Sequence, residues 1–249
     1  MHLKYPMLFV AAFIVLFSSC KKKEGPTGPQ GPIGPAGPAY SGVITGHVSL
    51  YDQYGIRQYK NLGGIKVDLN GSVTTLTDST GYYRFDSVAT GNYNIMVSKA
   101  GYGATRSGYT AFVKDTLYKN FRMSAVPDFD LLSFAAFFNA GTTYDSVVMT
   151  VNADTRARTW IVFVSNKPGV SSSNYLLAFA RTINPNLTRV GMRISAAELN
   201  SAGIFYGEMI YYAAYSYVVG DVSVYEDAAT GNSIYTAVGT ALVDTAIAP

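Results

Sequence analysis

Few residues of this chain have the types and spacing that enzymatic chemistry requires. The sequence holds two histidines, His2 and His47. His2 lies in an apolar leader, so a Ser-His-Asp triad would have to be built around His47, whose alternating surroundings indicate a position on the face of a sheet. The sequence has no HExxH zinc motif, no GxSxG nucleophile motif and no glycine-rich phosphate loop. We therefore predict no catalytic residues, no cofactor and no enzymatic activity.

The carboxylates and the cysteine do not form a pattern that indicates a glycosidase or a metal site. Glu198 and Glu208 could form a glycosidase pair, but they lie on different predicted elements. Asp128 and Asp130 alternate at the start of a strand and could bind calcium with loop carbonyls, although we favour a solvated domain boundary. The single cysteine, Cys20, has no partner in the chain, so a structural zinc site would lack thiolates. We predict no metal site.

Cys20 follows a leader that has the organisation of a secretion signal. Residues 1–19 contain a short segment with Lys4, an apolar run from Met7 to Phe17 and then small residues. This run is shorter than the roughly 20 apolar residues that a membrane span needs. The sequence Leu16-Phe17-Ser18-Ser19-Cys20 resembles the bacterial lipoprotein signal, in which the cysteine is lipidated and becomes the mature N-terminus. The resemblance implies a membrane anchor on Cys20, and the alternative is an ordinary signal peptide.

The charges next to the cysteine bear on location and partners. Lys21-Lys22-Lys23-Glu24 could contact anionic lipid headgroups. Charged residues at this place resemble surface-export signals of some Gram-negative groups, so we expect the outer-membrane surface, with the periplasmic face as the alternative. From Gly25 onward, 15 lysines and arginines remain of the chain's 19, and 15 acidic residues remain of its 16. This balance leaves no basic stripe for nucleic acid.

Five Gly-Pro-X triplets follow, over residues 25–39. Glycine occupies every third position, at Gly25, Gly28, Gly31, Gly34 and Gly37, which is the collagen pattern. Because five triplets are too short to hold a triple helix by themselves, we favour a polyproline-II spacer that reaches about 45 Å at roughly 3.1 Å per residue. The alternative is a homotrimer through this segment. Both interpretations hold the following domains clear of the lipid.

The rest of the chain predicts an all-β protein. The remaining roughly 210 residues suffice for two sandwiches of about 100 residues each, and the 20 tyrosines with 14% charged residues favour strands. Pro127 marks a junction because it ends strand pairing. We predict a signal peptide over 1–19, a lipidated and linker segment over 20–39, and two consecutive antiparallel β-sandwiches over 40–126 and 127–249.

The first predicted sandwich shows spaced glycines between strand patterns. Val43–Leu50 alternates as a strand, and Asp78 and Gly81 form a turn before a strand in which Tyr83 and Phe85 face the same side. The pattern resembles the carboxypeptidase regulatory-like domain, a prealbumin-like sandwich, through Gly46, Gly64-Ile65-Lys66-Val67, Thr77-Asp78, Gly81-Tyr82-Tyr83-Arg84-Phe85, Gly91-Asn92-Tyr93 and Gly101-Tyr102. The resemblance implies a non-catalytic stability or interaction module.

The second predicted sandwich shows strand patterns at regular spacing. They cover Phe129–Phe138, Tyr144–Val151, Thr159–Ser165, Tyr175–Thr182, Thr188–Ile194, Glu208–Val218 and a last hairpin over Val222–Thr236. The order resembles a fibronectin type III-like sandwich, in which Trp160 would fill the core; an exposed sugar-stacking platform is the alternative. We expect Tyr211, Tyr215 and Tyr217 on one face of their strand and Tyr212 on the other.

These observations predict a lipid-anchored, non-catalytic display or binding module of the cell envelope, with a glycan or a protein as ligand. The first alternative is a glycan-binding accessory lipoprotein of a polysaccharide uptake system. Its candidate stacking residues are the loop tyrosines Tyr51, Tyr54, Tyr59, Tyr102 and Tyr109. The second alternative is a structural stalk that trimerises through the collagen-like segment.

Overall fold

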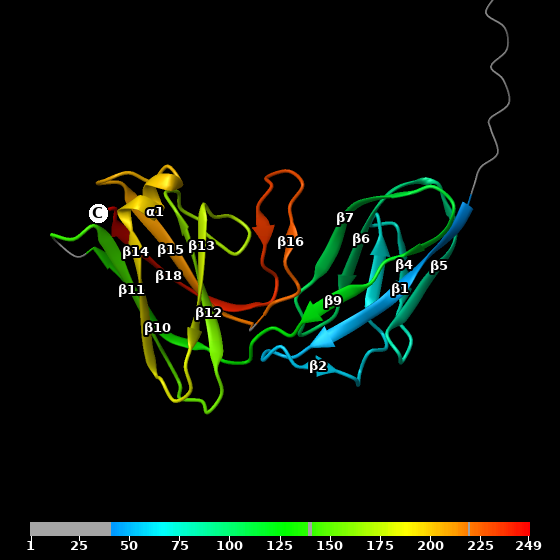
Figure 1. Cartoon of the computed structure of the whole chain (residues 1–249), viewed down its shortest axis with the longest axis horizontal. Helices are drawn as coiled ribbons and strands as arrows, with labels where there is room; N and C mark the ends of the chain where they lie inside the picture. The colour runs from blue at the N-terminus through cyan, green and yellow to red at the C-terminus, as the bar shows by residue number, and fades with distance from the viewer. Residues whose placement is uncertain (1–40, 139–140, 219) are drawn as a thin grey trace, which may run out of the picture. The chain divides into compact units, whose positions relative to one another are not determined.

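The computed structural model of the chain describes residues 41–138, 141–218 and 220–249 and leaves the side chain of Tyr109 undescribed (Figure 1). The signal peptide, Cys20 and the Gly-Pro-X linker lie outside the described residues. By their contacts, the described residues form one compact unit. The described part is nearly all β-structure, as predicted, with one short helix. None of its helices has the length and apolar character to cross a membrane.

The first sandwich consists of two sheets. The five-stranded sheet is built around β1 (Ser41–Tyr51), which pairs with β2 (Arg57–Gln58), β5 (Tyr82–Ala89), β8 (Asp115–Tyr118) and β9 (Phe121–Ser124). The four-stranded sheet has the order β4 (Val73–Leu76), β3 (Lys66–Leu69), β6 (Gly91–Ser98) and β7 (Thr105–Phe112). Alternate residues of these strands fill the core, and Tyr83 and Phe85 both point into it, as predicted.

The sheet around β1 is not purely antiparallel, which the prediction did not foresee. β1 pairs in parallel with β8 through its first half and with β9 through its second half. Two glycines of β1 allow the chain to pass close by. A Cβ on Gly46 would lie 1.9 Å from the carbonyl oxygen of Lys119, and a Cβ on Gly42 would lie 2.2 Å from that of Asp115. A larger residue at either position would push the neighbouring strand away.

The predicted turn before β5 is confirmed. Oδ1 of Asp78 accepts hydrogen bonds from the backbone N–H groups of Thr80, at 2.8 Å, and Tyr82, at 3.0 Å. Hydrogen bonds from Thr80 and Tyr82 lower the pKa of Asp78. Gly81 has a φ of 84° and lies against the Val48 carbonyl, so glycine suits this position for both reasons.

The second sandwich also has two sheets. One has the order β10 (Leu131–Phe138), β11 (Tyr144–Val151) and β14 (Arg189–Ser195), and helix α1 (Ala196–Ser201) follows β14. The other has the order β13 (Leu177–Ile183), β12 (Arg158–Ser165), β15 (Met209–Tyr217) and β18 (Val238–Ile247). At one edge the sheets are joined, because the Ala136 N–H on β10 donates a 2.9 Å hydrogen bond to Oδ2 of Asp244 on β18.

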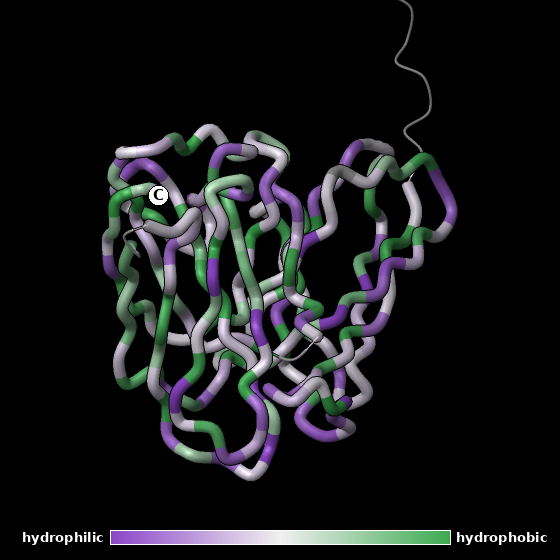
Figure 2. The backbone as a smooth tube through the Cα atoms, turned by 60° about the vertical axis from the view of Figure 1, so that its left-hand side comes forward, coloured by the Kyte–Doolittle hydropathy of each residue, from purple (hydrophilic) through white to green (hydrophobic). Residues whose placement is uncertain are grey.

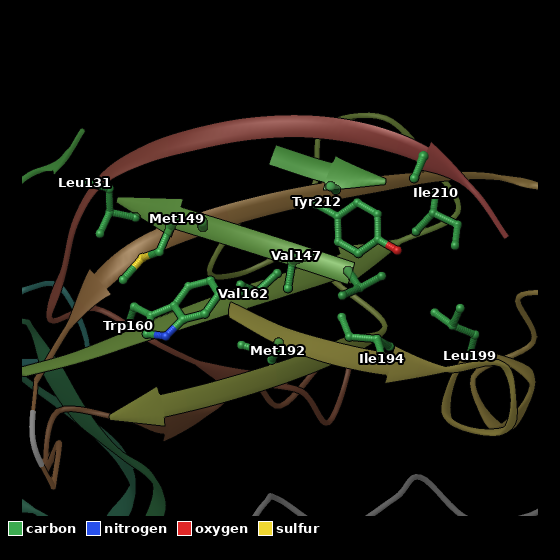
Figure 3. Close-up of a cluster of buried hydrophobic side chains, with 14 of the residues drawn as sticks. Leu131, Val147, Met149, Trp160, Val162, Met192, Ile194, Leu199, Ile210 and Tyr212 are labelled. Atoms are coloured by element: carbon green, nitrogen blue, oxygen red, sulfur yellow. The ribbon is translucent and has the colours of Figure 1, made fainter. Parts of the chain in front are cut away.

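The core between these sheets contains the tryptophan (Figure 3). Trp160 is 0% exposed, so the prediction that it fills the core is confirmed and a sugar-stacking platform at this residue is wrong. β11 alternates regularly, with Val147, Met149 and Val151 buried and the residues between them facing outward. Hydrophobic and hydrophilic residues are interspersed along the chain, and several of the turns are hydrophilic (Figure 2).

The last predicted strands differ from the observed ones. The hairpin expected to close the second sandwich forms two short strands, β16 (Tyr225–Glu226) and β17 (Ser233–Ile234), in a separate two-stranded sheet. β18 instead completes the four-stranded sheet. Its sequence, VGTALVDTAI, lacks the period-2 alternation on which strand prediction depends, because the apolar residues Val243 and Ile247 lie at outward positions that are 70% and 51% exposed.

Candidate binding surface

Two of the tyrosines predicted to stack on sugars lie under arginines. The guanidinium carbon of Arg122 lies 4.7 Å from the ring centroid of Tyr51, and that of Arg156 lies 3.7 Å from the ring centroid of Tyr54. A guanidinium group over an aromatic ring makes a favourable cation–π contact. It also covers one face of the ring, so each of these tyrosines has at most its second face left for a ligand.

The other predicted tyrosines differ in exposure. Tyr59 is 76% exposed, with the guanidinium carbon of Arg57 5.3 Å from its ring centroid. Tyr102 instead packs against the core of the first sandwich, and its backbone pairs with Ala125. Tyr109 belongs to β7, and its side chain lies outside the described groups. Among the four predicted tyrosines whose side chains are described, Tyr59 thus has the ring most open to a ligand.

The carboxylates considered for catalysis have local structural contacts. Oε2 of Glu198 accepts a 2.8 Å hydrogen bond from the backbone N–H of Ser195, in a capping box at the start of α1. These hydrogen bonds from Ser195 are the main cause that lowers the pKa of Glu198. Oε2 of Glu208 accepts a 3.1 Å hydrogen bond from the backbone N–H of Phe205. Each carboxylate therefore stabilises a local turn by accepting a hydrogen bond from the backbone N–H three residues before it.

His47 and Asp128 are also held by nearby groups. The backbone N–H of His47 donates a 2.9 Å hydrogen bond to the side chain of Asn120, and the His47 side chain lies on the exposed face of β1. Nε2 of Gln53 lies 2.5 Å from Oδ1 of Asp128, and the Asp128 N–H donates to Oε1 of Gln53 at 2.9 Å. The described residues contain no group of three or more His, Cys, Asp and Glu side chains arranged to hold a metal ion.

The outer face of the four-stranded sheet in the second sandwich is covered. It carries an aromatic cluster formed by Phe163, Tyr175, Tyr215, Tyr217 and Tyr235. The Phe163 ring centroid lies 4.9 to 5.6 Å from those of three of these tyrosines. Burial is the main cause that raises the pKa of Tyr217. As predicted, Tyr211, Tyr215 and Tyr217 share a face opposite Tyr212, but this face is packed.

The segment that covers this face also contacts the first sandwich. We name residues 221–236, which include β16 and β17, the strap. Its Ser223 Oγ accepts a 2.7 Å hydrogen bond from the Ser124 N–H on β9. Arg106 on β7 forms a 3.2 Å ion pair with Asp227, and its guanidinium carbon lies 4.6 Å from the Tyr225 ring centroid. The strap therefore occupies the outer surface of one sheet and leaves the opposite sheet of the sandwich uncovered by it.

The outer face of the β10–β11–β14 sheet carries a shallow groove of about 430 Å³. The register aligns the outward residues of the three strands in rows across this face. The rows are Ser133, Thr150 and Arg189, then Ala135, Val148 and Gly191, then Phe137, Ser146 and Arg193. Because the middle row has the smallest side chains, the sheet is hollowed between the two outer rows. We name this surface the β11 groove.

Gly191 is central to the groove because it lacks a side chain. A Cβ at this position would lie 2.8 Å from the Val147 carbonyl oxygen, closer than real contacts allow. Glycine therefore brings β14 close to β11 and also keeps the middle of the outer face low. Next to it, the hydroxyls of Ser133 and Thr150 form a 2.7 Å hydrogen bond that joins β10 to β11 at one end of the groove.

Arg181 and Arg193 line the groove, and Arg189 lies two residues from Gly191 on the same outward face of β14. Arg189 and Arg193 both point outward from β14, and Arg193 places its guanidinium carbon 4.5 Å from the Tyr144 ring centroid. In the other sheet, Arg181 on β13 lies directly opposite Trp160 on β12. The two side chains therefore point to the same face of that sheet. Because β13 is an edge strand, Arg181 stays exposed and reaches the β11 groove. None of the three forms an ion pair among the described residues.

Sequence reasoning missed this surface. The segment 188–194 is predicted as a strand, yet the hypotheses on ligands rest on loop tyrosines. The signal that could reveal the groove is the alternation Arg189, Gly191, Arg193 between the apolar residues Val190, Met192 and Ile194. In a half-buried strand this alternation sends the two cations and the glycine to one outer face.

The fold defines a class of β-sandwich proteins, and one part of it matches a known family. Residues 60–124 match the model of the carboxypeptidase regulatory-like domain, which confirms that resemblance for this segment. The match begins after β2 and ends with β9. The resemblance of residues 127–249 to a fibronectin type III-like sandwich stays a prediction. No curated protein matches the chain.

Among solved structures, a Bacteroides uniformis protein provisionally described as carbohydrate-binding is 14% identical, with a TM-score of 0.32 over 82% of this chain and 99% of that one. A DUF3823 family protein from Parabacteroides merdae is 12% identical, with a TM-score of 0.30 over 81% and 98% of the two chains. A DUF3823 family protein from Bacteroides ovatus is 12% identical, with a TM-score of 0.31 over 84% and 100%. Likeness at this level does not bear on what this chain binds.

Proposed function

We propose that this protein is a lipid-anchored, non-catalytic binding module of the cell envelope that carries its β-sandwiches on a stiff stalk. The anchor and the stalk rest on the sequence, through the apolar leader, Cys20 and the Gly-Pro-X triplets. Stable anchoring needs more than one acyl chain, as the lipid of bacterial lipoproteins provides. The lysines after Cys20 support a position against a charged membrane, and we favour the outer-membrane surface over the periplasmic face.

The observation that carries the binding function is the β11 groove. It lies on an outer sheet face, where Gly191 and Arg193 line it and the register places Phe137 and Arg189 on the same face. The carboxylates considered for catalysis lie in turns of their own, at α1 and at the start of β15, where they accept backbone N–H groups. A shallow groove with hydrogen-bonding and aromatic side chains suits the capture of an extended ligand.

A glycan-binding accessory of a polysaccharide uptake system is the second candidate, and the same groove favours it. Aromatic side chains with polar neighbours on an open sheet face provide both stacking and hydrogen bonds for sugars. Phe137 is 44% exposed and lies opposite Ser146 in the register, with Arg193 next in the row. The exposed ring of Tyr59 on the first sandwich is a further stacking candidate.

The anchoring is tested by metabolic labelling with a lipid precursor. We expect the wild type and a Ser19→Ala variant to incorporate the label, because both keep the cysteine and a small residue before it, and a Cys20→Ser variant to lose it. Protease shaving of whole cells then separates surface exposure from the periplasmic face. Label that persists in Cys20→Ser would contradict the proposed anchor.

The binding is tested with the full-length protein in detergent on a glycan array. Val148 points outward and lines the groove, so the larger side chain of a Val148→Trp variant would fill it. We expect this variant not to bind the glycans that the wild type binds. Thr74→Trp is the matched control, because Thr74 is an exposed residue of β4 in the other sandwich. Equal glycan binding by both variants would place the ligand outside the β11 groove. Sedimentation of the same protein tests the trimeric-stalk alternative.

A further inference from the structure

We propose that the β11 groove binds a polysaccharide that carries carboxylate groups, such as a polyuronate. This inference rests on the function proposed above, because it assigns a ligand class to the same surface. It is derived from the charges around the groove, from the spacing of the arginines along β14 and from the size of the groove.

The charges around the groove select an anionic ligand. Arg181, Arg189 and Arg193 are all exposed, and none of them forms an ion pair among the described residues. Glu198 is the acidic residue whose pKa Arg181 lowers, although hydrogen bonds from Ser195 lower it more. That carboxylate is held in the capping box of α1, so the groove keeps an excess of positive charge. A guanidinium group binds a carboxylate through two parallel hydrogen bonds, which a neutral sugar cannot match.

The spacing of the arginines selects an extended polymer. Arg189 and Arg193 are four residues apart on one strand and point to the same face, which separates their Cα atoms by about 13 Å. Gly191 lies midway, so no side chain of β14 blocks the path between them. A chain lying along β14 could present one carboxylate to each arginine and rest a sugar ring in the hollow over Val148. In the row of Arg193, Ser146 and Phe137 follow on neighbouring strands, about 4.8 Å apart.

The size of the groove disfavours other acidic ligands. A stable protein interface takes about 20 to 30 residues from each side, whereas seven residues line this groove. A duplex nucleic acid would need a broader basic surface, and the charges from Gly25 onward are balanced. A slender anionic polysaccharide needs neither a large interface nor a high overall charge.

Affinity electrophoresis of the full-length protein in detergent tests this assignment. The gels contain polygalacturonate, alginate or hyaluronan, each paired with the same polymer after methyl esterification of its carboxylates. We expect at least one carboxylated polymer to retard the protein and its ester to release it. The Arg189→Gln, Arg193→Gln double variant should bind that polymer about tenfold more weakly or worse, since each arginine contributes charge-assisted hydrogen bonds.

The control is an Arg84→Gln, Lys114→Gln double variant, which removes two exposed cations from the first sandwich and should migrate like the wild type. Retardation that survives esterification, or that the control variant loses equally, would overturn the inference. So would an absence of retardation by all three carboxylated polymers, or equal retardation by polyglutamate, which would indicate an acidic polypeptide. The proposed function fails separately: a protein that takes up no lipid label is not anchored, whatever it binds.

Discussion

The hydroxyl of Tyr212 on β15 donates a 2.5 Å hydrogen bond to Oδ2 of Asp145 on β11, inside the second sandwich. The bond connects the two sheets through their shared core. Asp145 is 0% exposed, and its other oxygen, Oδ1, has no hydrogen-bond partner in the described part of the chain. Burial raises the pKa of Asp145, and the bond from Tyr212 opposes this rise. An ionised carboxylate at this place therefore depends on one donor.

Tyr212→Phe should destabilise the protein by about 1.5–3 kcal/mol, the usual contribution of a hydrogen bond to a charged group, because it leaves Asp145 buried without a donor. Urea unfolding followed by circular dichroism measures the change in the free energy of unfolding. Tyr211→Phe is the matched control, since Tyr211 lies on the opposite face of the same strand. An equal effect of the two substitutions would show that the bond does not stabilise the core.

Asp145→Asn should change how stability depends on pH. Because burial raises the pKa of Asp145, the folded chain holds this proton more tightly than the unfolded chain, where the pKa is about 3.9. The stability that this proton contributes is fully present below about pH 3.9 and is lost as the pH rises through the folded-state pKa. The free energy of unfolding of the wild type, minus that of Asp145→Asn, should fall over this range. A difference that rises with pH would contradict the direction of the shift.

Gly46→Ala should destabilise the first sandwich by about 1–3 kcal/mol, as overpacking does. The added Cβ would collide with the Lys119 carbonyl oxygen and push away the segment that joins β8 to β9. Thermal unfolding measures the loss. Gly108→Ala is the control, because a Cβ at Gly108, also in a strand, meets no atom within 4 Å. If both alanine variants melt together, the close passage of the chain at Gly46 does not limit stability.

Ser223→Ala should weaken the attachment of the strap. Ser223 is buried, and its hydroxyl is the acceptor for the Ser124 N–H, which would be left unsatisfied at a cost of about 1–3 kcal/mol. Amide hydrogen exchange should become faster at Ser124 and along the strap. Ser233→Ala changes a serine of the strap whose backbone carbonyl, and not its hydroxyl, accepts the bond from Tyr175. Unchanged exchange in Ser223→Ala would show that other contacts hold the strap.

Much of the fold could be predicted from local patterns. The alternation in β1 and β11 predicts strands because a half-buried strand repeats every two residues. The same reasoning separates Tyr212 from Tyr211 on β15. The position of Trp160 in the core was expected from the resemblance to a fibronectin type III-like sandwich. Asp78 and Gly81 identify their turn because the side-chain hydrogen bonds of Asp78 and the positive φ of Gly81 involve only neighbouring residues.

The rest depends on pairings between distant segments. No local pattern shows that β1 pairs in parallel with β8 and β9, because that arrangement is decided by where the chain returns. β18 was not predicted because apolar Val243 and Ile247 occupy exposed outward positions, which removes the alternation of apolar and polar residues. The candidate site was missed for a related reason: Arg181 and Arg193 belong to different sheets, and only the edge position of β13 brings Arg181 to the groove.

Because the strap covers only one sheet of the second sandwich, the two outer faces of this sandwich differ in how well they tolerate substitutions. A library aimed at new ligands gains little from the aromatic side of β12 and β15, where substitutions would disturb packed rings. Outward positions on β10 and β11 differ in this respect, because their side chains point away from the core. Ala135 and Val148 could therefore be randomised together, with Gly191 kept because a Cβ there would meet the Val147 carbonyl oxygen.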